Sequence, residues 1–341
     1  MRLEGTVLRG RSFEPVEGAV VVENGTITDI EEGPVDSTDI VLPAFVNAHT
    51  HIGDSVAKEA GEGLSLEELV APPDGLKHRL LRAASHEELV SGMVQTMGFM
   101  EQAGTAAFLE FREGGVGGVD AIDTASAGFD LDPVVLGRES IEAMEAADGF
   151  GASGAADGEF SRERSATRAA DKLFGIHAGE VDSGDINPAL DLDPDFLVHM
   201  VHAETVHLDR VADSDTPVVV CPRSNAVTGV GLPPVGRLLD RTTVALGTDN
   251  VMLNSPSMFR EMAFTAKTTD LSSPTVLRMA TVNGAEIAGL DCGLVTPGRP
   301  AALLVLDGGS DNLCGAHDPR RAVVRRAGVS DVSAVVYPTG S

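Results

Sequence analysis

Short apolar runs alternate with amphipathic stretches through the middle of the chain, from about residue 39 to residue 290. Continuous runs of Val, Ile, Leu and Phe are typical of strands covered on both faces, as in parallel sheets. The stretches between them carry helix signals: Ser85 and Glu88 form a capping box, and Pro274 suits a first helical turn. We expect these helices to end near residues 103 and 289. The strand-like runs are residues 40–46, 105–111, 133–136, 173–176, 196–198, 217–220 and 243–246.

Repeated strand–helix units over this length predict an α/β fold, a (β/α)8 TIM barrel rather than a doubly wound sheet. An eighth strand is then needed between residues 136 and 173, and residues 150–153 are the best candidate. The ends of the chain are β-rich: residues 19–23 and 26–30 flank the hairpin signal Asn24-Gly25, and residues 301–306 and 332–337 have the same character. We therefore expect residues 1–40 and 296–341 to form a small β-sandwich domain beside a barrel of residues 41–295. Two unrelated edge hairpins are the alternative.

The amino-acid composition mainly narrows the classes of protein and of binding partner. The 341 residues include 25 Lys and Arg against 52 Asp and Glu, a formal charge of −27, which disfavours nucleic acids and anionic membranes as partners. A disordered acidic chain is excluded by the 43% of hydrophobic residues. The acidic excess instead predicts a halophilic protein that is kept soluble in concentrated salt. With neither a signal peptide nor a membrane-spanning run visible, and only three scattered cysteines, we expect a cytoplasmic protein.

Metal-capable residues follow four of the strand-like runs. His49 and His51 come after the first run and face the same way, because side chains alternate along an extended chain. His177, His199 and Asp249 follow three later runs. The carboxyl ends of barrel strands are where active sites are built, so we expect these side chains to share one face. An HxH pair on its own is also typical of surface or core histidines.

Together these segments resemble the amidohydrolase superfamily, in its cytosine deaminase and chlorohydrolase-like branch. The resemblance rests on LPAFVNAHTH at 42–51, HAGE at 177–180, the strand end at His199, CPRSN at 221–225 and LGTDN at 246–250. Residues 280–285 and 297–307 are similar to the family's last helix and its return to the small sheet. The resemblance thus covers nearly the whole chain and implies the barrel with its small β domain.

The resemblance also implies a mechanism. His49, His51, His177 and Asp249 would hold one divalent metal, Zn²⁺ or Fe²⁺, which lowers the pKa of water towards ~7. Asp249 would also accept the water's proton, Glu180 would shuttle it to the ring nitrogen and the leaving ammonia, and His199 would stabilise the tetrahedral centre. The chain has no lysine between Lys77 and Lys172, which argues against a second metal held by a carboxylated lysine.

The implied reaction is hydrolytic deamination of a purine, a pyrimidine or a related nitrogen heterocycle. Hydrolysis of a cyclic amide, or of another C–N or C–Cl bond, on the same site is an alternative. A non-catalytic metal-binding relative is a third reading, which the presence of both Glu180 and Asp249 disfavours. The expected partner is a small heterocyclic molecule, and a homodimer is common among the relatives.

Substrate contacts are expected from side chains at the same strand ends. A cluster of cations there would suit a carboxylate or phosphate on the substrate. The alternative is that each cation pairs with a nearby acid, as Arg112 would with Glu110 or Glu113, and that His202 merely begins a helix. The candidates are Glu110, Arg112, Arg138, His202, Arg223, Ser224 and Asn225, with Lys77 and Arg79 adding positive charge nearby.

Overall fold

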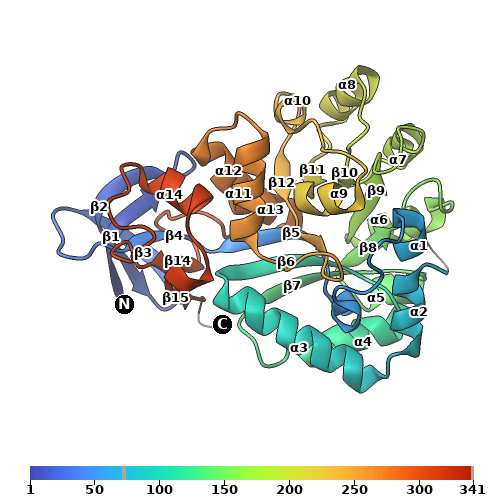
Figure 1. Ribbon diagram of the computed structural model, residues 1–341, viewed down its shortest axis with the longest axis horizontal. Helices are drawn as coiled ribbons and strands as arrows, with labels where there is room; N and C mark the ends of the chain where they lie inside the picture. Colours follow the sequence, from blue (N-terminus) through green and yellow to red (C-terminus); the bar gives the residue numbers. More distant parts are fainter. Residues whose placement is uncertain (71–73, 339–341) are drawn as a thin grey trace.

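The computed structural model describes residues 1–70 and 74–338, which form two sheets with helices around the larger one (Figure 1). The larger sheet has the order β12-β11-β10-β9-β8-β7-β6-β5-β13, and every neighbouring pair is parallel. This TIM-barrel-like arrangement confirms the fold class. Its strands are β5 (Phe45–His51), β6 (Thr105–Arg112), β7 (Asp132–Gly137), β8 (Gly149–Ala152), β9 (Leu173–Ala178), β10 (Phe196–His199), β11 (Val218–Val220), β12 (Val244–Leu246) and β13 (Asp249–Asn250).

The sheet returns to its first strand through the split eighth strand. β13 follows β12 after Gly247 and Thr248, and it pairs with β5 at Thr50 and His51. Beside this junction the Asn47 amide donates to Thr248 Oγ1 at 2.7 Å, and the Thr248 backbone N–H donates to Asn47 Oδ1 at 3.0 Å. The weak segment expected to supply the fourth strand does so as β8, one residue earlier than predicted.

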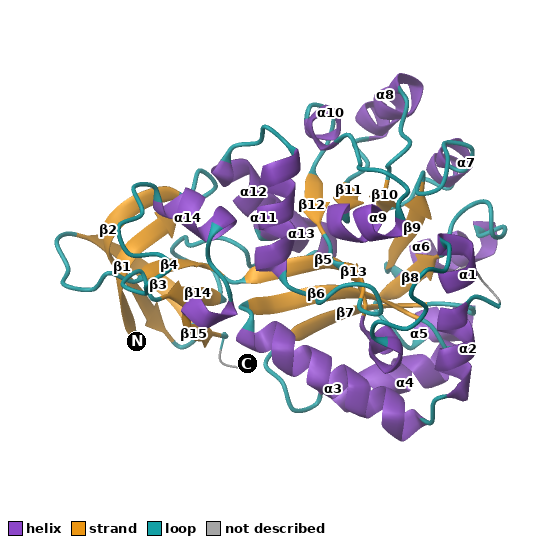
Figure 2. Cartoon of the chain, viewed as in Figure 1, coloured by secondary structure: helices purple, strands orange, loops and turns teal. Residues whose placement is uncertain are grey.

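Helices cover the outside of the parallel sheet (Figure 2). The capping box is present at the start of α3 (His86–Gln102), where Ser85 Oγ accepts from the Glu88 backbone at 3.2 Å. The helix predicted for 274–289 is broken at Thr281, whose hydroxyl donates to the Leu277 carbonyl at 2.7 Å. No helix of the described residues is long and apolar enough to cross a membrane. The other elements here are η1 (Ile52–Ala57), α1 (Leu66–Val70), α2 (Leu76–Ala83), α4 (Gly115–Ser126), α5 (Ile141–Glu145), α6 (Ser161–Ala170), α7 (Ile186–Asp191), α8 (Thr205–Ser214), α9 (Pro222–Thr228), α10 (Val235–Leu239), α11 (Met258–Thr268), α12 (Ser273–Ala280) and α13 (Val282–Ala288).

Strands from both ends of the chain form the smaller sheet, in the order β15-β14-β4-β1-β2-β3. The hairpin turn lies at Asn24 and Gly25, both with positive φ, as a type I′ turn requires. Because the two termini share one sheet, the alternative of two unrelated hairpins is wrong; a sandwich of two layers stays a prediction. The strands of this sheet are β1 (Arg2–Arg9), β2 (Glu14–Glu23), β3 (Thr26–Glu32), β4 (Ile40–Pro43), β14 (Leu303–Leu306) and β15 (Val332–Val336). Between β14 and β15 the chain forms α14 (Pro319–Arg325) and η2 (Val329–Asp331).

The run at 40–46, predicted as one barrel strand, is divided between the two sheets. The Ala44 N–H donates to the Ala302 carbonyl of the C-terminal region, whereas the next N–H, of Phe45, donates to Gly104 at the start of β6. The chain therefore changes sheets at Ala44. Both halves of the run are buried, so the hydrophobic pattern carries no mark of the change.

Candidate metal-dependent active site

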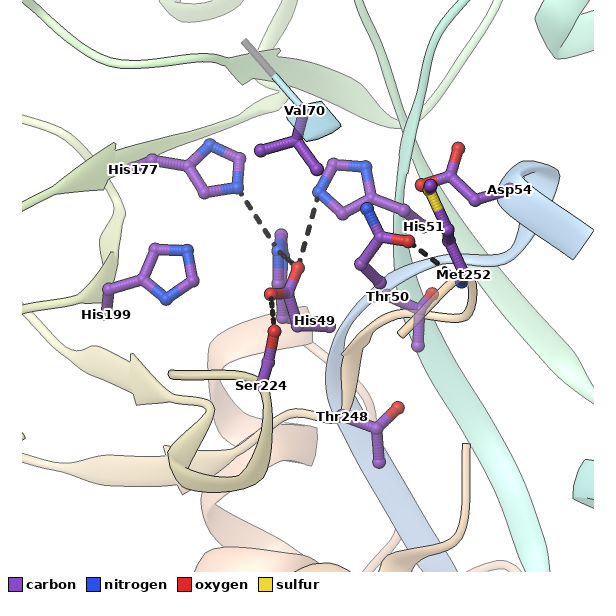
Figure 3. Close-up of polar contacts among 12 residues, drawn as sticks. His49, Thr50, His51, Asp54, Val70, His177, His199, Ser224, Thr248 and Met252 are labelled. Carbon is purple, nitrogen blue, oxygen red and sulfur yellow. Dashed lines mark hydrogen bonds and ion pairs between the residues drawn. The ribbon is translucent and has the colours of Figure 1, made fainter. Parts of the chain in front are cut away.

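Side chains from the carboxyl ends of β5, β9 and β13 meet around one point. His49 Nε2 lies 3.3 Å from Asp249 Oδ1 and 3.2 Å from His177 Nε2, and His51 Nε2 lies 3.7 Å from Asp249 Oδ1. Figure 3 shows the rings of His177 and His51 turned toward His49. Potential ligand atoms of the described residues form two groups that share His49: one with His51 and Asp249, the other with His177 and His199. The four predicted ligands are thus neighbours, and His199 lies among them.

Further hydrogen bonds fix the orientation of these side chains. His177 Nδ1 lies 2.8 Å from the Ala152 carbonyl, so its proton belongs on Nδ1 and Nε2 is left free. The Ser224 hydroxyl, on α9, donates to Asp249 Oδ2 at 2.5 Å and leaves Oδ1 facing the histidines. His51 Nδ1 lies 3.0 Å from a carboxylate oxygen of Glu113.

Burial sets the protonation states that a metal would need. It lowers the pKa of His51 to about 3, and it also lowers the pKa of His49 and His177. Burial by itself would raise the pKa of Asp249, but its hydrogen bond to His49 and the nearby histidines hold that pKa well below the usual range. At neutral pH the cluster therefore offers three neutral imidazoles and one carboxylate, the forms that bind a cation.

The spacing of the donor atoms fits a shared divalent ion. Tetrahedral bonds of about 2.0–2.1 Å place neighbouring ligand atoms about 3.4 Å apart, and the separations here are 3.2, 3.3 and 3.7 Å. His49 is fully buried, and its Nδ1 has no hydrogen-bond partner among the described residues. A metal bound through Nε2 would place the ring proton of His49 on Nδ1, so the support for a metal comes from the spacing and chemistry of the donor atoms. The donor set thus suits a divalent metal.

Glu180 and His199 lie beside this ligand set. His199 Nε2 is 3.5 Å from Glu180 Oε2, and ligand atoms of both residues and of Asp249 lie within 4.8 Å of one another. The Asn225 amide lies 3.1 Å from His199 Nδ1. Because that amide donates to Nδ1, a neutral His199 carries its proton on Nε2, on the side of Glu180. Burial raises the pKa of Glu180, which favours its protonated form.

The backbone at the site adopts conformations that side chains normally avoid. His199, Met200 and Asp249 have φ values of 79°, 56° and 58°, in the left-handed region. Such strain persists where the surrounding structure holds it, and it is concentrated at functional sites. Gly247 lets the backbone after β12 pass close to His49, because a Cβ at position 247 would stand 2.7 Å from the Cβ of His49.

A cavity of about 510 Å³ opens onto these groups. His51, His177, Glu180, His199 and Asp249 all line it, and Ser224 lies beside them. Its described walls also contain Leu66, Val70, Val181, Val230 and Leu253, so a polar reacting face adjoins an apolar wall. This combination is typical of a small-molecule site.

Five of the predicted substrate contacts are absent from the wall of this cavity: Glu110, Arg112, Arg223, His202 and Asn225. Glu110 is fully buried and accepts from Thr50 Oγ1 at 2.7 Å and from the Ile52 backbone at 2.8 Å, so it ties β6 to β5. Arg112, 2% exposed, lies against Glu110 and donates to the Glu113 carbonyl at 2.9 Å. Arg112 thus pairs with Glu110, which is the alternative considered from the sequence.

Arg223 pairs with Glu261 of α11 at 3.4 Å and donates to Asn254 Oδ1 at 3.0 Å. His202 is half-buried and is also absent from the cavity wall, immediately before the loop to α8. Arg138 does line the cavity, but it forms an ion pair with Glu113 at 2.7 Å. Of the remaining candidates, Ser224 lines the cavity and donates to Asp249, whereas Asn225 contacts His199 and is absent from the cavity wall.

Sequence reasoning missed the position of Glu113. It directly follows β6, and its carboxylate contacts Lys77 and Arg138 as well as His51. The one available signal was its place at a strand end, the same signal that identified the metal ligands.

Comparison with known proteins gives relatives over nearly the full chain. An uncharacterised protein of Methanocaldococcus jannaschii is 35% identical over 336 aligned positions, 88% of each chain. A 5-methylthioadenosine/S-adenosylhomocysteine deaminase of Haloarcula marismortui is 30% identical and covers 92% of this chain and 85% of its own.

Solved structures show the same fold at lower identity. A zinc-bound adenosine deaminase from Xanthomonas campestris has a TM-score of 0.80 at 21% identity, covering 99% of this chain and 91% of its own. An atrazine chlorohydrolase from Arthrobacter aurescens complexed with zinc has a TM-score of 0.81 at 17% identity, covering 99% and 94%. The model of the amidohydrolase family matches residues 40–192 and 191–336. With the fold, the strand-end histidines and this match in agreement, the chain belongs to the amidohydrolase family.

Proposed function

We propose that this protein is a metal-dependent deaminase that converts an amino group on a purine, pyrimidine or related nitrogen heterocycle into a carbonyl group and releases ammonia. Family membership confirms the expected enzyme class, a hydrolase acting on C–N bonds. The observation that carries the proposal is the position of Glu180 and His199 beside the His–Asp cluster, because such a pair supplies a proton shuttle and an oxygen-stabilising donor.

His49, His51, His177 and Asp249 would hold the metal, in the proposal carried over from the family resemblance; the separations of 3.2–3.7 Å from His49 to His177, from His49 to Asp249 and from His51 to Asp249 support it. When bound, a divalent metal lowers the pKa of water towards ~7 and so supplies hydroxide at neutral pH. Zinc is our proposal over iron, because three imidazoles and a carboxylate suit Zn²⁺ and two proteins of the same fold are described with zinc.

The remaining steps belong to side chains of this chain. The attacking water supplies two protons. Glu180 transfers the first to the ring nitrogen, and Asp249 accepts the second as the oxygen becomes a carbonyl. Glu180 then passes this second proton to the departing amino group, which leaves as ammonia. Burial raises the pKa of Glu180, the direction that suits a carboxyl group that must take up and release a proton. His199 donates from Nε2 to the oxygen that becomes the product carbonyl. One water is consumed and one ammonia leaves, so atoms and protons balance.

The substrate we infer has no anionic group held by the strand-end cations. Lys77 pairs with Asp54 and Glu113, Arg138 with Glu113, and Arg223 with Glu261. Each positive charge is therefore already matched, in agreement with the alternative considered from the sequence. Relatives named as deaminases of 5-methylthioadenosine, S-adenosylhomocysteine and 5'-deoxyadenosine make a nucleoside-type heterocycle the first class to test. A cytoplasmic location, which the three free cysteines support, and a homodimer belong to the same proposal.

A screen for ammonia release tests the reaction. Nucleobases, nucleosides and pterins are incubated with the protein in concentrated salt, and the metal content of the same preparation is measured. We expect ammonia from at least one heterocycle and about one metal per chain. Ring opening or chloride release without ammonia would replace deamination with the alternative hydrolysis, and an active preparation free of metal would overturn the mechanism.

A further inference from the structure

Three charged residues that are not predicted ligands, Glu113, Lys77 and Arg138, form a buried group on the Nδ1 side of His51. Glu113 follows β6, Lys77 lies in α2 and Arg138 follows β7, so three separate elements meet there. Glu113 Oε1 lies 2.7 Å from Lys77 Nζ, 2.7 Å from Arg138 Nη1 and 3.0 Å from His51 Nδ1. The side chains of Glu113 and Lys77 are only 4% exposed, and that of Arg138 is 10% exposed.

The contact with Glu113 decides which ring nitrogen of His51 is free. A carboxylate can only accept a hydrogen bond, which places the proton of a neutral His51 on Nδ1 and the lone pair on Nε2. Lys77 Nζ also lies 3.3 Å from His51 Nδ1, but it lies closer to Glu113, at 2.7 Å, and to Asp54, at 2.9 Å. The ammonium therefore donates to the two carboxylates, and the 3.0 Å contact with Glu113 sets the tautomer. Nε2 is the atom directed towards Asp249 Oδ1, at 3.7 Å. A carboxylate partner also makes the imidazole a more basic ligand.

Lys77 and Arg138 hold the carboxylate of Glu113 in position. Lys77 Nζ and Arg138 Nη1 both lie 2.7 Å from Glu113 Oε1, so two cations from different elements fix the oxygen that faces His51. Lys77 is itself held by Asp54 at 2.9 Å, which orients its ammonium group within the buried group. A buried carboxylate with two cationic partners remains charged and fixed in place.

His51 differs here from its neighbour ligand. His177 is oriented by the backbone carbonyl of Ala152, which no substitution removes. His51 is oriented by a side chain, so its support can be changed without touching a predicted ligand.

We propose that Glu113 is a positioning residue of the metal centre, which fixes the tautomer and ring orientation of His51 while Lys77 and Arg138 hold its carboxylate in place. This inference rests on the proposed metal-dependent function, but its test reads metal binding and tautomer state without any substrate. A protein that binds zinc through a supported His51 and deaminates nothing would contradict the proposed function alone.

The test compares zinc affinity among variants by competition with a chromophoric chelator in concentrated salt. Glu113→Gln replaces the acceptor with an amide of the same shape, and we expect zinc affinity to fall roughly 10- to 100-fold. Glu113→Asp keeps a carboxylate and should recover part of that loss. Glu261→Gln is the matched control, because Glu261 is equally buried and cation-paired but contacts none of the predicted ligands. Wild-type affinity in Glu113→Gln would overturn the proposal.

A second measurement keeps the test decisive if Glu113→Gln fails to fold. NMR spectra of metal-free wild-type protein labelled with ¹⁵N-histidine distinguish the two neutral tautomers, and the His51 signal is assigned by its loss in His51→Gln. We expect His51 to carry its proton on Nδ1 at neutral pH. A proton on Nε2 would overturn the proposal, whatever the variants do.

Discussion

Removing the Ser224 hydroxyl tests how far the metal centre depends on its supporting hydrogen bonds. Ser224 Oγ donates to Asp249 Oδ2 at 2.5 Å, and Ser224 is 1% exposed. A hydrogen bond to a charged group contributes about 1.5–3 kcal/mol, and each 1.4 kcal/mol is about tenfold in an equilibrium constant. Asp249 also lines the cavity and is 7% exposed, so water can replace part of the lost contact. We therefore expect Ser224→Ala to weaken zinc binding by about tenfold, near the lower end of that range.

The assay is a zinc competition titration of Ser224→Ala against the wild type in concentrated salt. Thermal unfolding with saturating zinc and with chelator gives an independent measure, since a tenfold weaker affinity removes about 1.4 kcal/mol of zinc-dependent stabilisation. Ser165→Ala removes an exposed hydroxyl on α6 that bonds only to the Ser161 carbonyl, and it should bind zinc like the wild type. Equal zinc affinities for Ser224→Ala and the wild type would show that the Ser224–Asp249 hydrogen bond does not support metal binding.

Three further predictions concern stability, packing and salt. Burial raises the pKa of Glu261 from 4.5 to about 7, so the stability that its protonated form supports is fully present below pH ~4.5 and is lost as pH rises towards 7. Between pH 5 and 8 the wild type should lose on the order of 2–3 kcal/mol more unfolding free energy than Glu261→Gln; parallel denaturation profiles would contradict this. Gly247→Ala places a Cβ 2.7 Å from the Cβ of His49, so zinc titration should show at least about tenfold weaker binding, and unchanged affinity would show that the junction can relax. Dialysis into low salt should unfold or aggregate a chain of charge −27, and an unchanged circular dichroism spectrum there would remove the halophile hypothesis.

The sequence predicts the barrel well because its strands are apolar on both faces and end in polar residues. Even the weakly apolar segment that forms β8 could be predicted as a strand, since the barrel needs a strand between β7 and β9. The change of sheet at Ala44 could not be predicted, because it depends on which carbonyl each backbone N–H reaches, Ala302 or Gly104. The break at Thr281 was missed because a hydroxyl-to-backbone bond leaves no trace in the hydrophobic pattern.

The ligand set was predictable because strand ends gather at one face whatever the details of packing. Substrate contacts were not, because alternation gives the side of a strand on which Arg112 lies but not the partner it meets. In this fold Arg112 lies against Glu110, and Arg138 and Lys77 share Glu113. Sequence separation hides such pairs: Lys77 and Glu113 lie in different elements and meet only after β5, β6 and α2 are assembled.

The variant Glu180→Gln shows whether Glu180 moves the proton in the proposed metal-dependent deamination. Ammonia release and metal content are measured on the same preparations of variant and wild type, with a heterocycle identified by the screen. We expect the variant to keep its metal and to lose turnover by roughly 10²- to 10⁴-fold, because glutamine cannot carry the proton. A Glu180→Gln variant that keeps both its metal and wild-type turnover would show that Glu180 does not carry the proton.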